Sequence, residues 1–257
     1  MIEYRDLYKS FDAPVLAGIS LTVATGERLA IVGPSGTGKS VLLKTTIGLV
    51  VPDRGDVLVD GESVYFGGRG ALGRVRHKVG YVFQNAALFD SMTIFENMRL
   101  GIRDDELRTL EDEQVLERIC SSLSDVNLDP RAVMGKRPSG ASGGMRKRVG
   151  LARALVGRPR ILLYDEPVTG LDPVNSAAVG RLIAQIAERH TVTSVLVTHD
   201  VEGALELVDR IALLEGGHLV FVGTPTEFRG SQTPLVRAFA DRRAANAAAL
   251  SLMEGCP

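Results

Sequence analysis

The stretch Gly33-Pro-Ser-Gly-Thr-Gly-Lys-Ser40 fits the pattern G-x-x-x-x-G-K-[ST] at every position. The short apolar run Arg28-Leu-Ala-Ile-Val32 before it predicts a buried strand, and residues 40–47 after it predict a helix. The glycines let the backbone turn its N–H groups inward, and the helix points its positive end at the same place. We therefore expect a loop that binds polyphosphate. A chance glycine-rich turn is the competing interpretation, which the complete pattern in this context disfavours.

The side chains of this loop have separate expected roles. Lys39 is expected to place its charge on the β- and γ-phosphates, and the Ser40 hydroxyl to be a hard oxygen ligand for Mg²⁺. The other residues expected to bind the phosphates are Gly33, Pro34, Ser35, Gly36, Thr37 and Gly38.

Composition indicates an ordinary globular protein of 257 residues, 45% of them hydrophobic. Its 30 basic and 31 acidic side chains give a net charge of −1, so we expect no nucleic-acid partner and no general attraction to anionic lipid. The two cysteines, Cys120 and Cys256, lack the close neighbours of a metal site or a disulfide framework, which fits a reducing cytoplasm best.

The chain is not expected to cross a membrane or to be exported. Its longest uncharged run, residues 13–26, has 14 residues and contains Pro14, whereas a span needs about 20 apolar residues. The N-terminus lacks the charged-then-apolar build of a signal peptide. A membrane role would therefore come through a partner.

Strand and helix patterns divide the chain into parts. Residues 2–24 predict two antiparallel strands with Tyr8 and Phe11 in the first, and their rings fit base stacking and ordinary strand packing equally well. Residues 85–157 predict an inserted helical part, after which strands and helices alternate again. Residues 234–257 predict a helical tail. The alternation indicates a mostly parallel sheet that is covered on both faces.

Four candidate site residues fall just after or at the end of a predicted strand: Gly33, Gln84, Asp165 and His199. Because ligands of parallel sheets bind at the carboxyl ends of the strands, we expect these residues to gather at one edge.

Asp165 and Glu166 end an apolar run and are the central pair of that edge. Asp165 has the position of a carboxylate that holds Mg²⁺ opposite the phosphate loop, and Glu166 is the candidate for activating a water. A helix cap is the alternative for the pair, since Pro167 follows, but the phosphate loop favours catalysis. In isolation, His199 would more often be a surface or capping histidine. The residues expected to act in phosphoryl transfer to water are Lys39, Gln84, Glu166 and His199, and the metal ligands expected are Ser40, Gln84 and Asp165.

Ser139-Gly-Ala-Ser-Gly-Gly144 opens a predicted helix with a basic first turn, and it is a second turn suited to binding an anion. It has no ligand of its own, while the far side of the phosphate lacks donors within one chain. A head-to-tail pair of chains would solve both problems, because each turn would close over the ATP of the other chain.

These motifs, in this order and spacing, resemble those of the ATP-binding cassette (ABC) family over about residues 2–230. The matching elements are residues 33–40, Gln84, the signature Ala141-Ser-Gly-Gly-Met145, the pair Asp165-Glu166, the segment Gly170-Leu-Asp172 and His199. The resemblance implies an α/β P-loop NTPase fold with a RecA-like mixed sheet, an N-terminal antiparallel β part and a helical subdomain at 85–157. Residues 1–233 would form one nucleotide-binding domain.

The same resemblance implies ATP and Mg²⁺ as cofactors and a second copy of the chain as partner. It adds to the expected nucleotide-binding residues the adenine-stacking Phe11 together with Ser142, Gly143, Gly144 and Asp172. Ala141 and Met145 replace the usual Leu and Gln of the signature. Because the anion contacts come from Ser142 and backbone N–H groups, we expect activity to persist.

A finer resemblance is to the ATPase subunits of Mla/Mce-type lipid transporters, and Met145-Arg-Lys-Arg148 and Tyr164 are its most discriminating residues. It implies a place on the cytoplasmic face of the inner membrane, as a peripheral subunit. The partners implied are a membrane permease, a mammalian-cell-entry-type lipid-binding protein and a small accessory subunit. Short variants of these motifs also occur in polar amino-acid importers, so import of such a small solute is the alternative.

Residues 85–99 are expected to contact the permease through Leu88, Phe89, Met92 and Phe95, for which core packing is an equally good interpretation. A soluble ABC protein acting on nucleic acid or ribosomes is a weaker alternative. Two observations disfavour this alternative. Only 57 residues, 85–141, separate Gln84 from Ser142, and the chain has a single phosphate loop.

Overall fold

The computed structural model describes residues 1–240 of the chain. The predicted tail begins as helix α11 (Pro234–Ala240), and the rest of that prediction, residues 241–257, lies outside the described residues. Among residues 1–240, no helix has the length and apolar character needed to span a membrane.

A four-stranded antiparallel sheet forms the N-terminal part, as expected. Its order is β2-β1-β4-β5, and its strands are β1 (Ile2–Ser10), β2 (Pro14–Val23), β4 (Arg54–Val59) and β5 (Glu62–Ser63). The prediction that placed Phe11 in the first strand was wrong. The Asp53 carboxylate accepts the Ser10 N–H at 2.7 Å and ends β1 there, so Phe11 lies in the following turn with 61% of its surface exposed.

The main sheet has six strands in the order β10-β9-β3-β8-β7-β6. Strands β9, β3, β8, β7 and β6 run parallel, and β10 pairs antiparallel with β9 at the edge. Their bounds are β3 (Arg28–Val32), β6 (Val79–Val82), β7 (Ile161–Asp165), β8 (Thr193–Thr198), β9 (Arg210–Glu215) and β10 (His218–Gly223).

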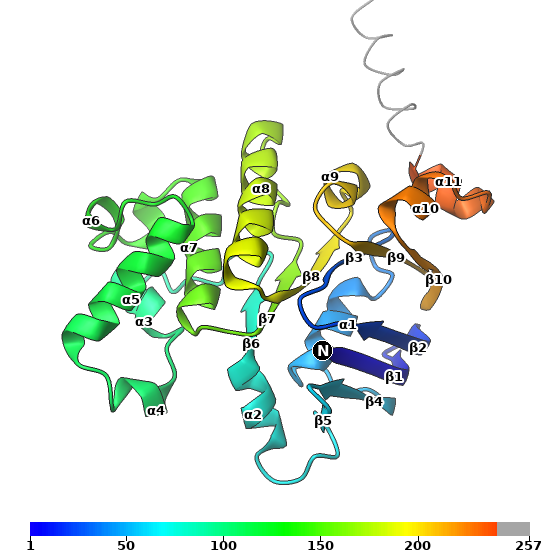
Figure 1. The fold of residues 1–257 in the computed structure, drawn as a ribbon, viewed down its shortest axis with the longest axis horizontal. Helices are drawn as coiled ribbons and strands as arrows, with labels where there is room; N and C mark the ends of the chain where they lie inside the picture. Colours follow the sequence, from blue (N-terminus) through cyan, green and yellow to red (C-terminus); the bar gives the residue numbers. More distant parts are fainter. Residues whose placement is uncertain (241–257) are drawn as a thin grey trace, which may run out of the picture.

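Alternating side chains of these strands enter two separate hydrophobic cores. Ala30 and Val32 of β3 pack with the helices on one face, whereas Leu29 and Ile31 pack with α1 (Lys39–Thr46) and the antiparallel sheet on the other. The sheet is therefore covered on both faces, as predicted, but on one of them a second sheet provides most of the cover. Figure 1 shows the helices α3, α5, α6 and α7 together on the left, beyond β6 and β7, and the antiparallel sheet on the right.

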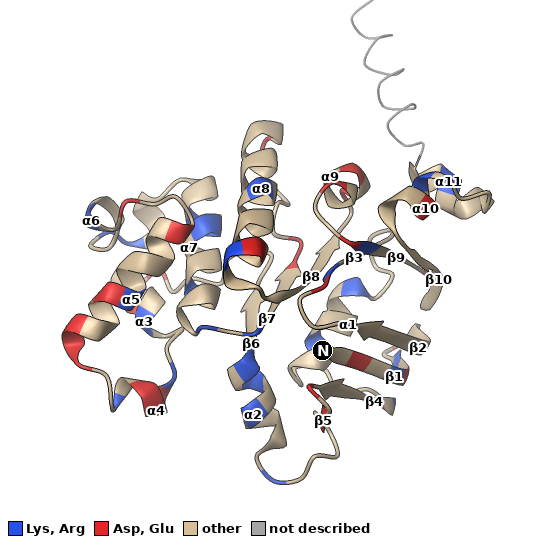
Figure 2. Ribbon diagram, viewed as in Figure 1, with Lys and Arg blue, Asp and Glu red and all other residues tan. Residues whose placement is uncertain are grey.

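Residues 85–157 contain helices and no strand, as expected. The segment consists of α3 (Ile94–Arg99), α4 (Asp104–Leu107), α5 (Asp112–Asp125), α6 (Pro130–Val133), a 3-10 turn (Pro138–Gly140) and α7 (Gly143–Val156). Val115, Ile119 and Leu123 form the buried face of α5, which packs against α7. Acidic side chains gather on α4 and α5, and basic ones lie on α2 (Ala71–Lys78) (Figure 2).

The remaining helices cover the face of the main sheet opposite α1. They are α8 (Pro173–His190), α9 (Val201–Leu205) and α10 (Pro225–Arg229), followed by α11. No helix was predicted from the sequence at α2, α9 or α10, each of which has eight residues or fewer.

Candidate functional site

The predicted phosphate loop connects the carboxyl end of β3 to α1. Lys39 is buried, and its Nζ donates to the main-chain oxygens of Gly33 at 2.9 Å and Pro34 at 2.6 Å. Burial lowers the pKa of Lys39, and the nearby carboxylates of Glu166 and Asp165 partly offset that effect. The ammonium group is thus held over the loop and surrounded by acceptors.

Two glycines allow the loop to turn into the helix. Gly36 and Gly38 have φ angles of 84° and 96°, which residues with a side chain rarely adopt. A Cβ on Gly38 would lie 2.7 Å from the main-chain oxygen of Val15 in β2, so the loop packs directly on the antiparallel sheet. Thr37 closes the turn by donating from Oγ1 to the Pro34 oxygen at 2.9 Å.

Hard oxygen atoms face each other beside the loop. The Ser40 hydroxyl donates to Asp165 Oδ1 at 2.5 Å, across the gap between α1 and β7, and Asp165 is only 5% exposed. A hydroxyl and a carboxylate are the ligands that Mg²⁺ accepts when phosphates and waters complete its coordination. Within residues 1–240, no group of three or more His, Cys, Asp or Glu side chains could hold a metal alone. The pair therefore fits a magnesium ion that is shared with phosphate.

Glu166 follows in a strained backbone position, with φ at +50°. Its N–H donates to the Val197 oxygen of β8 at 2.9 Å, and its carboxylate points to the strand end of β8. Glu166 Oε2 accepts hydrogen bonds from His199 Nδ1 at 2.7 Å and from Thr169 Oγ1 at 2.9 Å. The ends of β7 and β8 are adjacent, and this is what brings Glu166 and His199 together.

These groups share one cavity of about 440 Å³. Predicted residues from five segments line it, namely Phe11, Ser35, Gly36, Gly38, Lys39, Ser40, Gln84, Glu166 and His199. The prediction that polar residues gather at the carboxyl edge of the sheet is confirmed for Gln84 and His199. An aromatic ring, a lysine, the Glu166 carboxylate and a glycine loop around one cavity suit a nucleoside triphosphate.

Comparison with known proteins also indicates a protein that binds a nucleotide. Residues 16–169 match the profile of a family described as ABC transporter. The chain is 38% identical over 249 residues to the probable ribonucleotide transport ATP-binding protein mkl of Mycobacterium tuberculosis. That alignment covers 94% of this chain and 67% of the relative. The chain belongs to the ABC transporter family.

Other relatives of this ABC protein have different names. The sulfate/thiosulfate import ATP-binding protein CysA of Caulobacter vibrioides is 39% identical over 231 residues, which cover 88% of this chain and 65% of the relative. The chloroplastic protein TRIGALACTOSYLDIACYLGLYCEROL 3 of Arabidopsis thaliana is 38% identical over 263 residues, covering 93% and 73%. The chain thus spans about two thirds to three quarters of the length of these relatives.

A solved structure has a similar fold and contains a bound nucleotide. The dimeric, post-hydrolysis ATP-binding cassette MJ0796 bound to ADP and Pi has a TM-score of 0.78 and 29% identity, over 88% of this chain and 99% of that one. The chain is therefore the ATP-binding subunit of an ABC transporter. It hydrolyses ATP, with Mg²⁺ as the usual companion of the nucleotide.

Seven of the predicted nucleotide-binding residues do not line the cavity of this ABC protein. Three of them, Gly33, Pro34 and Thr37, belong to the phosphate loop itself, and the other four lie on α7 and before α8. Ser142 caps α7 by accepting the Met145 N–H at 3.3 Å, so that Gly143 and Gly144 form the first turn of that helix. Asp172 caps α8 and accepts from the N–H groups of Val174 and Asn175. Within one chain these four residues stay apart from the phosphate loop.

Sequence reasoning missed two side chains that touch the site. Thr169 bonds Glu166, as described, and Tyr81 of β6 donates from Oη to Asp165 Oδ2 at 2.9 Å. Burial, followed by the charge of Asp165, raises the pKa of Tyr81, so its hydroxyl is a proton donor at neutral pH. No signal in the sequence points to this contact, because it depends on β6 lying beside β7.

Helix α7 also holds the loop that carries Gln84. Lys147 Nζ donates to the main-chain oxygen of Gln84, and Arg153 donates to those of Ala86 and Ala87 at 3.0 and 2.7 Å. Ala86 and Ala87 have φ angles of 58° and 48°, so two consecutive residues adopt the left-handed conformation. The main chain after β6 is therefore strained and bound by cations.

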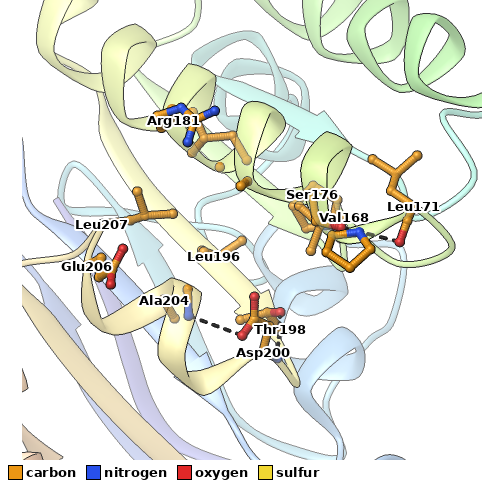
Figure 3. A pocket seen from close by; sticks show the side chains of 16 residues that line it. Val168, Leu171, Ser176, Arg181, Leu196, Thr198, Asp200, Ala204, Glu206 and Leu207 are labelled. Carbon is orange, nitrogen blue, oxygen red and sulfur yellow. Dashed lines mark hydrogen bonds between the residues drawn. The ribbon is translucent and has the colours of Figure 1, made fainter. Parts of the chain in front are cut away.

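A second cavity, of about 380 Å³, lies between α8, α9 and residues 167–171 (Figure 3). Apolar side chains such as Leu196 and Leu207 make up most of its lining, and the carboxylate of Asp200, which also lines it, accepts the Gly203 N–H at 3.1 Å. It contains neither the glycine loop nor a lysine. We therefore assign the phosphates to the first cavity.

Proposed function

We propose that this chain is the ATP-hydrolysing motor of an ABC transporter, in which two copies pair head to tail around two ATP molecules and drive a separate membrane permease. The observation that carries the proposal is the position of Ser142, Gly143 and Gly144. These residues form the start of α7, which is suited to binding an anion, but they do not line the nucleotide cavity of their own chain. The dimeric state of the similar cassette MJ0796 supports the pairing.

Within each site, the residues have the following proposed roles. Lys39 and the loop hold the phosphates, while Ser40, Asp165 and Gln84 hold Mg²⁺, which supplies charge neutralisation at the phosphates when bound. Glu166 accepts a proton from the attacking water. His199 orients the Glu166 carboxylate through the 2.7 Å contact, and Phe11 stacks on the base. From the second copy, Ser142, Gly143 and Gly144 donate to the γ-phosphate, and Asp172 contributes at the interface.

We propose one nucleotide-binding domain over residues 1–233, with residues 85–157 as its helical subdomain. Residues 85–99 would contact the permease at a cavity of about 360 Å³ between β6, α2 and α7, which Phe83, Phe89 and Leu100 line. Phe89 is 54% exposed, whereas Leu88 and Phe95 pack against the helical core. Phe89 is therefore the strongest candidate contact, packing explains Leu88 and Phe95, and the half-buried Met92 stays a candidate. This contact would place the chain on the cytoplasmic face of the inner membrane.

For the cargo we propose phospholipid or another hydrophobic molecule, handled with a mammalian-cell-entry-type protein and a small accessory subunit. The run Met145 to Arg148 and Tyr164 support this assignment, as does the glycerolipid in the name of the Arabidopsis relative. Import of a small solute is the second candidate, because the similarity to a sulfate/thiosulfate import protein favours it to the same degree.

Co-purification tests both parts of the proposal. The tagged chain is isolated from native membranes in mild detergent, and bound proteins and lipids are identified by mass spectrometry. A permease with a mammalian-cell-entry protein and phospholipid supports lipid transport, whereas a permease with a soluble binding protein and no lipid supports solute import.

The same preparation tests the permease contact. Phe89→Glu should abolish co-purification of the permease, while Phe66→Glu should leave it intact. Phe66 is the matched control because it is also an exposed phenylalanine, at 77%, but lies between β5 and α2. Equal recovery of the permease with both variants would contradict the proposed surface.

A further inference from the structure

Both oxygens of the Asp165 carboxylate have a hydroxyl donor. Ser40 donates to Oδ1 at 2.5 Å from the start of α1, and Tyr81 donates to Oδ2 at 2.9 Å from β6. Strand β6 lies beside β7 with Tyr81 paired to Leu163, so the phenol reaches the end of its neighbouring strand. The carboxylate is therefore held from both sides in a site that excludes most water.

Tyr81 also lines the cavity between β6, α2 and α7, together with Phe83 and Phe89. The centroid of its ring lies 4.5 Å from that of the Phe83 ring. One residue thus lies at the proposed permease surface and donates its hydroxyl to Asp165.

We propose that Tyr81 is a positioning residue that fixes the Asp165 carboxylate for Mg²⁺. The torsion about the Cβ–Cγ bond of an aspartate is soft, so a carboxylate held by one donor alone can rotate. The phenol supplies the second donor and leaves the Ser40 side of the carboxylate directed at the metal. Groups that orient metal ligands in this way contribute tenfold or more to metal affinity. This inference rests on the proposed role of Asp165 as the magnesium carboxylate.

The test is the magnesium dependence of nucleotide binding by the full-length chain, measured with a fluorescent ATP analogue. Tyr81→Phe removes only the hydroxyl and keeps the ring. We expect nucleotide affinity in EDTA to be unchanged and the Mg²⁺ concentration at half-saturation to rise about tenfold.

Tyr65→Phe is the matched control. The Tyr65 hydroxyl donates to the main-chain oxygens of Thr45 at 2.5 Å and Val50 at 2.8 Å, so its loss removes buried hydrogen bonds without touching Asp165. We expect this variant to titrate Mg²⁺ as the wild type does.

Two results would overturn the role of Tyr81: an unchanged Mg²⁺ titration in Tyr81→Phe, or an equal loss of affinity in EDTA, which would indicate packing alone. Failure of the proposed function has a different signature. In that case the wild type itself would bind nucleotide without any response to Mg²⁺, and Lys39→Ala would bind as tightly as the wild type.

Discussion

Replacing Gly38 by alanine tests whether the phosphate loop depends on its contact with the antiparallel sheet. The new Cβ would lie 2.7 Å from the Val15 oxygen, 2.8 Å from Val15 Cγ1 and 3.1 Å from Leu16 Cδ2. The left-handed backbone costs a non-glycine residue about 1–2 kcal/mol, and overpacking costs about 1–3 kcal/mol more. We expect the free energy of unfolding to fall by about 2–5 kcal/mol, which is a large share of the about 5–15 kcal/mol of a typical domain.

Gly36→Ala is the internal control for this experiment. Gly36 lies in the same loop with φ at 84°, but nothing lies within 4 Å of its Cβ position, so only the backbone cost of about 1–2 kcal/mol applies. Both variants and the wild type are unfolded in urea, followed by circular dichroism, and the midpoints are compared at a common slope. A difference between the two variants of less than about 0.5 kcal/mol would refute the steric argument, since additive errors are of that size.

Three further predictions concern single charges. Glu166→Gln should keep ATP affinity and lower turnover about 10²- to 10⁴-fold while trapping a paired, ATP-bound form, as measured by phosphate release and gel filtration; wild-type turnover would exclude Glu166 as the base. Lys39→Ala should weaken nucleotide binding about 10- to 100-fold, because charged hydrogen bonds to the phosphates are lost; calorimetry giving unchanged affinity would contradict that contact. The bidentate contact with Arg28 lowers the pKa of Asp209, so the ion pair stabilises the fold above about pH 4 and its contribution disappears as the pH falls through the lowered pKa. Because Asp209 is 44% exposed, Asp209→Asn should cost only about 0.5 kcal/mol at pH 7, and urea unfolding should find a smaller difference from wild type as the pH falls below about 4.

The main sheet and the edge that carries the site were predictable because each local pattern agreed with the fold. Strand β3, the glycine loop and α1 are adjacent in the sequence, so residues 33–40 located them directly. The short helices were missed for physical reasons. Helix α2 follows the N-cap residue Gly70, which has no side chain to cap the helix, so its start carries no signal. Helix α10 did offer a signal, since Thr224 and Glu227 form a capping box with Pro225 between them.

Contacts between distant segments were beyond the sequence patterns. The Tyr81 hydroxyl meets Asp165 only because β6 is the neighbour of β7, and strand order within a parallel sheet leaves no mark on either strand. The end of β1 depends on Asp53, 43 positions from Ser10, so the place of Phe11 in a turn was equally out of reach.

The cations of α7 connect the main chain at residues 84–87 to the helix that has Ser142 as its N-cap. Lys147 and Arg153 make three hydrogen bonds to Gln84, Ala86 and Ala87. We therefore expect a displacement of α7, on pairing with a second copy, to be transmitted to Gln84 at the nucleotide cavity and to Phe89 at the proposed permease surface. The same three hydrogen bonds would then couple both places to the start of α7.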